Sequence, residues 1–256
     1  MGYKINRIYL WTQLVWPKQT FDAGIYHNAT LWLISISADW TNWTTIADKN
    51  YWATTVYNSW DTVSAANAGN FFQWWNNYPF PYSWATNIVT TQTSAASYSW
   101  QNPYSSSTFR NVNWYHWDSS ENKDLRWDVT NTLEARKWPC DTGWHVPTLD
   151  ELFWLLDLWS TLWAWNARPS VWTNFATYMK IPICYLHNWA YPYTFLWWLI
   201  SSSFWNDESW DADQLSITSS WTANKNNMAT VWINLRPFKN SPVVPDWTWT
   251  KIWPNS

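Results

Sequence analysis

The sequence predicts an α+β fold with antiparallel strands. Apolar and polar residues alternate between Leu31 and Ile36, and they alternate again between Leu215 and Leu235, as in half-buried strands. Between these regions, the segment 148–159 repeats its apolar residues at the three- and four-residue spacing of an amphipathic helix. A helix between two strand-forming regions places the chain in the α+β class.

The central helix has a well-marked first turn. Thr148 is expected as its N-cap, and Glu151 completes a capping box, so that the helix begins at Leu149. The apolar stripe that faces the core consists of Leu149, Leu152, Phe153, Leu156 and Trp159. Two more helices are expected, one over 61–75 with Asp61 as its cap and one over 170–180.

Strands are expected on both sides of these helices. The turn 39–43 closes a hairpin over 30–46, and strands near 30–48 and 228–238 are expected to share one sheet. The C-terminal tail is rich in Pro, Asn and Ser and has the composition of a linker. The predicted organisation is a lead-in over 1–29, one domain over 30–240 and a linker or tail over 241–256.

The composition bears on two classes of function. The 256 residues carry a net charge of −3 and only 13% of them are charged, which rules out a basic surface for nucleic acid and argues against a polybasic surface for membranes. The densest apolar run, 191–200, is about half as long as a membrane span. Abundant uncharged polar residues favour an extracellular or cell-surface protein. We therefore expect no nucleic-acid partner and no membrane span.

The chain contains 31 Trp but only 4 Gly, although a usual glycine content of about 7% would give roughly 18. Ten tryptophans directly follow Asp, Asn or Ser in turn-like surroundings: Trp40, Trp43, Trp60, Trp84, Trp100, Trp114, Trp189, Trp210, Trp221 and Trp247. Turns favour glycine there because glycine reaches positive φ without a Cβ clash. We infer that many tryptophans are translated from UGA in a bacterium that reads this codon as glycine. A surface naturally rich in tryptophan, such as a carbohydrate platform, is the alternative.

Five short segments form an ordered series of motifs. They are 45–54 (TIADKNYWAT), 72–77 (FQWWNN), 138–147 (WPCDTGWHVP), 201–203 (SSS) and 234–240 (NLRPFKN). These resemble the motifs adNlnGAT, yQWGNN, GPCPxGWHVP, WSSS and xVRCFKN of the Fibrobacter-succinogenes major paralogous domain family. Trp52 and Trp75 stand at glycine positions of the first two motifs. The resemblance covers roughly 30–240.

This resemblance implies a C-type-lectin-like fold, in which two helices pack on small twisted antiparallel sheets and long loops present a binding surface. It also implies an extracellular or cell-surface protein. The same fold class includes the variable proteins of diversity-generating retroelements, whose ligand-binding residues lie in a C-terminal segment before the last strand.

The chain departs from the family at two positions. Pro237 replaces the cysteine of the last motif, so Cys140 cannot form a disulfide with that strand, and Ile200 replaces the tryptophan before Ser-Ser-Ser. With Cys140 and Cys184 the chain can form at most one intrachain disulfide. The alternatives are a structural disulfide, two buried thiols, or a redox pair, which needs a low-pKa thiol in an electropositive pocket.

The sequence contains no recognised catalytic signature. It lacks a nucleophile elbow, a zinc-protease motif, a phosphate loop and a dinucleotide fingerprint. His145 is expected to be a structural, hydrogen-bonded histidine. The adjacent carboxylates of Asp150 and Glu151 are explained by the helix dipole and the capping box. The chain is therefore predicted not to be an enzyme.

The candidate ligand-binding residues lie in the segment 204–227, where aromatic and amide side chains combine rigid anchors with adaptable hydrogen bonds. They are Phe204, Trp205, Asn206, Asp207, Asp211, Asp213, Asn224, Asn226 and Asn227. Trp205-Asn206-Asp207 also matches a calcium-ligating triplet of sugar-binding lectins, and Glu208 adds a nearby carboxylate. The lectins' partner motif is absent, so a solvated acidic loop is favoured over a calcium site and no cofactor is expected. A surface loop without a ligand is the alternative.

Two functions from different classes follow from the sequence. The first is a non-enzymatic cell-surface or secreted module, including a diversified variable protein, that binds an extracellular protein or glycan through the 204–227 loops. The second is a structural or adhesive spacer in a long surface protein. An enzyme of the cysteine-oxidising type is the least favoured.

Overall fold

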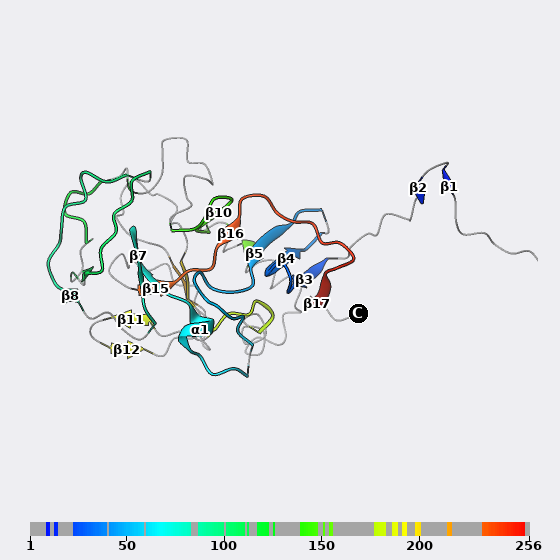
Figure 1. Ribbon diagram of the computed structural model, residues 1–256, viewed down its shortest axis with the longest axis horizontal. Coiled ribbons are helices and arrows are strands. Elements are labelled where there is room, and N and C mark those ends of the chain that lie inside the picture. Colours follow the sequence, from blue (N-terminus) through cyan, green and yellow to red (C-terminus); the bar gives the residue numbers. More distant parts are fainter. Residues whose placement is uncertain are drawn as a thin grey trace, which may run out of the picture.

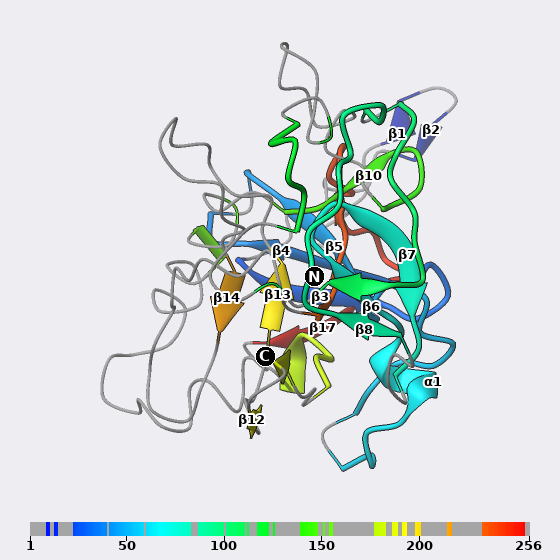
Figure 2. The ribbon, with the colours of Figure 1, turned by 90° about the vertical axis from the view of Figure 1, so that its left-hand side faces the viewer.

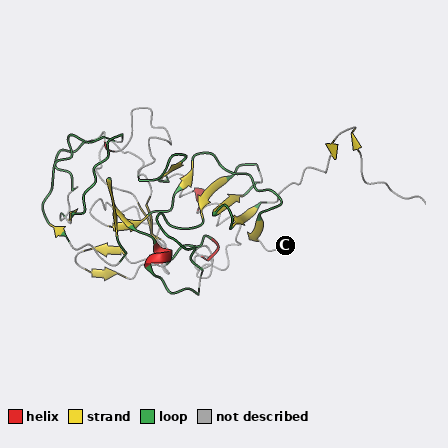
Figure 3. Ribbon diagram, in the orientation of Figure 1, coloured by secondary structure: helices red, strands yellow, loops and turns green. Residues whose placement is uncertain are grey.

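Strands and loops make up nearly all of the described part of the protein (Figures 1 and 3). The computed structural model describes residues 9–10, 13–14, 23–39, 41–58, 60–82, 87–99, 101–110, 112, 117–122, 125, 139–147, 151, 154–155, 177–182, 186–188, 191–193, 198–200, 214–216 and 232–253. Two antiparallel sheets form the body of the molecule.

The larger sheet has six antiparallel strands in the order β10-β16-β5-β4-β3-β17. Their bounds are β3 (Gly24–Asn28), β4 (Leu33–Ser37), β5 (Thr44–Ala47), β10 (Trp144–His145), β16 (Phe238–Lys239) and β17 (Thr250–Trp253). The hairpin β4–β5 lies at its centre, with Ile34 opposite Ile46. Between these strands the carboxylate of Asp39 accepts hydrogen bonds from the backbone of Thr41 and Asn42. The hairpin expected over 30–46 is therefore confirmed.

The second sheet has five strands in the order β12-β11-β15-β6-β7. Their bounds are β6 (Phe71–Gln73), β7 (Asn76–Phe80), β11 (Leu186–Asn188), β12 (Tyr191–Tyr193) and β15 (Trp232–Asn234). Three strand pairs complete the described strands: β1 (Tyr9–Leu10) with β2 (Gln13–Leu14), β8 (Ile88–Val89) with β9 (Phe109–Arg110), and β13 (Trp198–Ile200) with β14 (Gln214–Ser216). Figure 2 shows β6, β7 and the short helix α1 toward one side of the molecule.

The expected α+β, C-type-lectin-like fold is wrong. Antiparallel sheet dominates the described residues, and α1 (Ala65–Ala68) is only four residues long. Other α-helical positions in the described part of the chain are residues 151, 154–155 and 177–178. This small amount of helix is not the pair of helices that a C-type-lectin-like domain packs against its sheets.

The helix expected over 61–75 is limited to α1, because a close contact with the loop after β5 lies at its end. Ser64, rather than Asp61, is the N-cap, and Gly69 ends the helix at a φ of 73°. A Cβ at Gly69 would collide with the carbonyl oxygen of Tyr51, so this close approach of two loops requires glycine. Phe71 then starts β6, because the chain has turned into the second sheet.

The other two expected helices are only partly described. Glu151, Trp154 and Leu155 are helical, and Leu155 is buried. The remaining named positions of that helix lie outside the described residues: Thr148, Leu149, Asp150, Leu152, Phe153, Leu156 and Trp159. In the segment expected as a helix over 170–180, residues 177–178 are helical and a turn follows at 179–180.

The sheet partners of the last strands agree with the sequence only in part. Phe238 of β16 lies opposite Ile46 of β5, so this strand joins the hairpin as expected. In contrast, β15 pairs with β6 in the second sheet, with Ile233 opposite Phe72. The segment 235–237 therefore carries the chain from one sheet to the other.

The six-stranded sheet extends beyond the 30–240 range expected for the domain. On the N-terminal side it includes β3, and on the C-terminal side β17 pairs with β3 along Ile25–His27. The segment between β16 and β17 is also attached, since Ser35 Oγ donates to the Val243 carbonyl and the Val243 amide donates to Thr45 Oγ1, both over 2.7 Å. Val243 and β17 are therefore both hydrogen-bonded to the six-stranded sheet.

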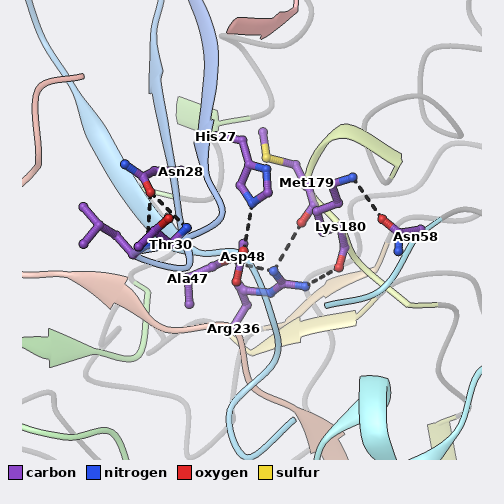
Figure 4. A network of polar contacts seen from close by, with 10 residues as sticks. His27, Asn28, Thr30, Ala47, Asp48, Asn58, Met179, Lys180 and Arg236 are labelled. Atoms are coloured by element: carbon purple, nitrogen blue, oxygen red, sulfur yellow. Dashed lines mark hydrogen bonds and ion pairs between the residues drawn. The ribbon is translucent and has the colours of Figure 1, made fainter. Parts of the chain in front are cut away.

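A buried guanidinium connects three segments of the fold (Figure 4). Arg236 is fully buried, and its Nε donates to Asn50 Oδ1 over 3.1 Å. Its Nη1 donates to the carbonyls of Ala47 and Met179, and its Nη2 donates to the carbonyl of Lys180 over 2.8 Å. Because such hydrogen bonds are charge-assisted, this side chain fixes the crossing segment against the loop after β5 and the turn at 179–180.

We expect Arg236→Met to lower the free energy of unfolding by at least about 3 kcal/mol, because it leaves several buried acceptors without their donor. The measurement is urea unfolding followed by circular dichroism. Arg110→Met is the matched control, since Arg110 is only half-buried and its Nη1 donates at the protein surface to the Thr91 carbonyl. Equal losses in the two variants would contradict the role assigned to Arg236.

A second polar centre organises the loops between β8 and residue 122. Asp118 is buried, and its Oδ1 accepts from the Ala95 amide while its Oδ2 accepts from the Asn122 amide. Asn122 Nδ2 in turn donates to the carbonyls of Ala95 and Tyr98, each over 2.7 Å. Burial acts to raise the pKa of Asp118, but hydrogen bonds from Ser120, Asn122 and Ala95 outweigh it and lower that pKa overall.

This lowered pKa predicts an acid-dependent contribution to stability. A carboxyl group whose pKa is lower in the folded chain stabilises the fold above its unfolded pKa, and that stabilisation is lost as the pH falls through the folded value. Asp118→Asn should cost on the order of 1–3 kcal/mol at neutral pH, and the difference from the parent chain should shrink below about pH 4. Thermal unfolding at a series of pH values measures this, and a pH-independent difference would contradict it.

Candidate functional site

An open cleft of about 460 Å³ lies beside the end of β5. Four segments line it: the turn between β3 and β4, the loop 47–53, the segment 141–144 that leads into β10, and the segment 235–237 through Pro237. The side chains with chemistry to offer are Trp32, Lys49, Tyr51, Trp52, Asp141 and Trp144. The cleft is therefore lined by four aromatic rings, one amine and one carboxylate.

Backbone hydrogen bonds position the segments around the cleft. Asn28 Oδ1 accepts from the amides of Thr30 and Leu31, which shapes the turn before β4. The Tyr51 amide donates to the Leu235 carbonyl over 2.7 Å, so the loop 47–53 is held against the segment that crosses between the sheets. The shape of the cleft therefore depends on how the sheets hold several segments together, and not on the conformation of one loop.

Tyr51 and Asp141 form a polar pair in the cleft. The Tyr51 hydroxyl donates to Asp141 Oδ1 over 3.3 Å. Burial, and then the negative charge of Asp141, raise the pKa of Tyr51 above its usual value. The hydroxyl therefore stays protonated at neutral pH, and the exposed carboxylate of Asp141 is available as a hydrogen-bond acceptor.

Lys49 supplies the positive charge among the side chains that line the cleft. Its Nζ lies 3.2 Å from the centre of the Trp32 ring, a cation–π contact. Burial lowers the pKa of Lys49, although the neighbouring charge of Asp48 opposes this shift. Together with Asp141, this amine gives the cleft one group of each charge.

Trp144 is an aromatic ring of the cleft that packs against the protein core. It is half-buried and packs against two core clusters, one containing Phe72 and Trp117 and the other containing Tyr26. Gly143 precedes it with a φ of 82°, and the Trp144 amide donates to the Asp141 carbonyl over 3.0 Å. This turn fixes the position of the Trp144 ring at the start of β10.

The nine ligand-binding candidates of the sequence lie outside the described residues, as does Glu208 of the calcium hypothesis. The nine are Phe204, Trp205, Asn206, Asp207, Asp211, Asp213, Asn224, Asn226 and Asn227. Between 204 and 227 the structure describes only β14. Sequence reasoning missed the cleft, although two segments that it had singled out as motifs, 45–54 and 138–147, meet there.

The two described histidine contacts are structural. His145 is fully buried, its Nδ1 lies 2.8 Å from Asn240 Oδ1, and its Nε2 lies 3.0 Å from both carboxylate oxygens of Glu151. The expectation of a hydrogen-bonded structural histidine is confirmed. His27 Nε2 lies 2.8 Å from the buried carboxylate of Asp48. Both imidazoles hold loops against the six-stranded sheet.

Cys140 is a free, buried thiol beside the cleft. Burial, together with the charge of Asp141, raises its pKa well above the usual value, so the sulfur is protonated and unreactive at neutral pH. Cys184 lies outside the described residues. Within the described part of the chain, no group of three His, Cys, Asp or Glu side chains could hold a metal ion.

No family model, curated protein or solved structure matches this chain. In the described residues we find no helix with the length and apolar character needed to cross a bilayer.

Proposed function

We propose that this chain is a non-enzymatic ligand-binding module, secreted or displayed at the cell surface, and that the cleft beside β5 takes a neutral glycan. The observation that carries the proposal is the combination of Tyr51, Trp144 and Asp141 around one open cavity. Ligand sites typically combine apolar rings with a few well-placed polar groups.

A sugar ring has an apolar face and polar hydroxyl groups, and the cleft offers partners for both. Its C–H face packs on an aromatic ring, which here is Trp144, while its hydroxyl groups both donate and accept hydrogen bonds. The Asp141 carboxylate accepts from such a hydroxyl, and the Lys49 amine donates to one. Because the cleft carries one positive and one negative group, it favours an uncharged polyhydroxylated ligand over a strongly anionic one.

Two features support binding without catalysis. The Cys140 thiol next to the cleft is held protonated, and the imidazoles of His27 and His145 are engaged in contacts away from the lining side chains. A hydrolase that cleaved a sugar would also need a pair of carboxyl groups across the bond. Asp141 is the carboxylate that the described lining of the cleft offers.

The proposal predicts measurable affinity for at least one neutral oligosaccharide. Isothermal titration calorimetry with cellohexaose, chitohexaose and mannohexaose should give a binding heat for the full chain, and the anionic oligogalacturonate should bind more weakly. Tyr51→Phe and Asp141→Asn each remove one polar group of the cleft without changing its shape. Each should weaken binding about tenfold, the effect of roughly 1.4 kcal/mol from one lost charge-assisted or phenolic hydrogen bond.

Asp246→Asn is the matched control for Asp141→Asn, because Asp246 is an exposed carboxylate that does not line the cleft and accepts from Thr248. Its affinity should equal that of the parent chain. Absence of heat with all of the neutral sugars would contradict a glycan ligand and leave a protein as the ligand class to test. Equal binding by the Asp141 variant and the control would move the site away from the cleft.

A further inference from the structure

Tryptophan dominates the strained backbone positions of this protein. Among the described residues, five that are not glycine have positive φ: Trp32 (60°), Trp52 (66°), Trp75 (61°), Glu121 (53°) and Lys180 (56°). Tryptophan makes up 31 of the 256 residues, yet it occupies three of these five positions. The left-handed region clashes with a Cβ and is rare for bulky residues, whereas glycine enters it freely.

All three tryptophans lie in tight turns. Trp32 precedes β4 in the turn from β3, and Trp52 follows β5 in the loop 47–53. Trp75 is the second residue of a two-residue hairpin loop, because Gln73 and Asn76 on either side are paired strand residues. Such loops favour glycine where φ is positive. Local backbone geometry therefore points to the same residue type at three separate turns.

Burial alone does not separate the tryptophans, because Trp75 is also buried in the core, but other buried tryptophans combine a packed ring with an unstrained backbone. Trp117 is fully buried, donates its indole N–H to the Trp74 carbonyl and stacks on Tyr104 with ring centres 4.6 Å apart. Trp43 is buried and meets Tyr26 edge-on. Neither residue has positive φ. Because these tryptophans pair a packed ring with an ordinary backbone conformation, their side chains fit the fold without strain.

This division corrects the expectation based on turn-like neighbours alone. Trp43 follows Asn42 but is a core residue, and Trp60 is 84% exposed without positive φ. Trp40, Trp84, Trp189 and Trp221 lie outside the described residues. Backbone φ is therefore a sharper criterion than the preceding residue.

We propose that Trp32, Trp52 and Trp75 are encoded by UGA and are glycine in the protein that the cell makes, whereas Trp117 and Trp144 are genuine tryptophans. The inference stands independently of the glycan proposal, since it rests on backbone conformation. It nevertheless defines the native cleft. With glycine at 32 and 52, the cleft keeps Tyr51, Trp144 and Asp141, and Lys49 is no longer covered by the ring of Trp32.

Peptide mass spectrometry of the protein isolated from the cells that produce it tests this assignment directly. Peptides covering 32, 52 and 75 should be lighter by the mass of one missing tryptophan side chain per site, and the peptide covering 117 should contain intact tryptophan. Tryptophan at 32, 52 or 75 would overturn the assignment at that position. Glycine at 117 would overturn the use of positive φ to separate the two groups of tryptophans.

A second measurement tests for backbone strain in the protein that contains tryptophan at these positions. Trp32 and Trp52 are about half-exposed or more, so Trp32→Gly and Trp52→Gly remove strain without opening a core cavity. Each should raise the Tm by about 2–4 °C. Trp60→Gly is the matched control, because Trp60 is exposed but lacks positive φ, and it should give no rise. Equal Tm changes in all three variants would contradict strain at positions 32 and 52.

Discussion

The buried guanidinium of Arg236 is the interaction on which the rest of the structure depends. It sits on the segment 235–237, where the chain passes from the five-stranded to the six-stranded sheet, and it donates to oxygens of the loop after β5 and of the turn at 179–180. A buried charge is tolerated only when its donors are satisfied, so these segments must stay in place together. The relative position of the two sheets is fixed by this requirement.

The cleft inherits its geometry from the same centre. The loop 47–53 is attached on one side by Arg236 through Ala47 and Asn50, and on the other by the amide of Tyr51 to the Leu235 carbonyl. Trp144 faces it from β10, which pairs with β16 just beyond the crossing segment. A binding surface that sheets and backbone hydrogen bonds already hold in place loses little conformational entropy when a ligand binds. Fewer contacts are then needed to reach a given affinity.

The sequence predicts the local features of this fold better than its architecture. The β4–β5 hairpin is correct because its alternation and its turn lie within one short stretch. The prediction of a helix over 61–75 is wrong because the Tyr51 carbonyl lies against Gly69, where the helix ends, and β6 begins at Phe71. Tyr51 belongs to another loop, so the apolar spacing within 61–75 carries no sign of this contact. The cleft was missed for the same reason, since Tyr51 and Asp141 are ninety residues apart and meet only through the sheet. Long-range contacts of this kind leave no periodic signal in a single sequence.

The pairing of β3 with β17 has a mechanical consequence. Ile25 lies opposite Trp253 and His27 lies opposite Thr250, so the chain enters β3 and leaves β17 at the same end of this ladder. A pulling force applied through these two points would load the hydrogen bonds one after another, as in opening a zipper, instead of all at once as in shear. If the module is linked into a tethered chain, β17 would peel away at low force before the Arg236 centre is disturbed. The edge strand would then act as a yielding element, lengthening the tether while the cleft keeps its shape.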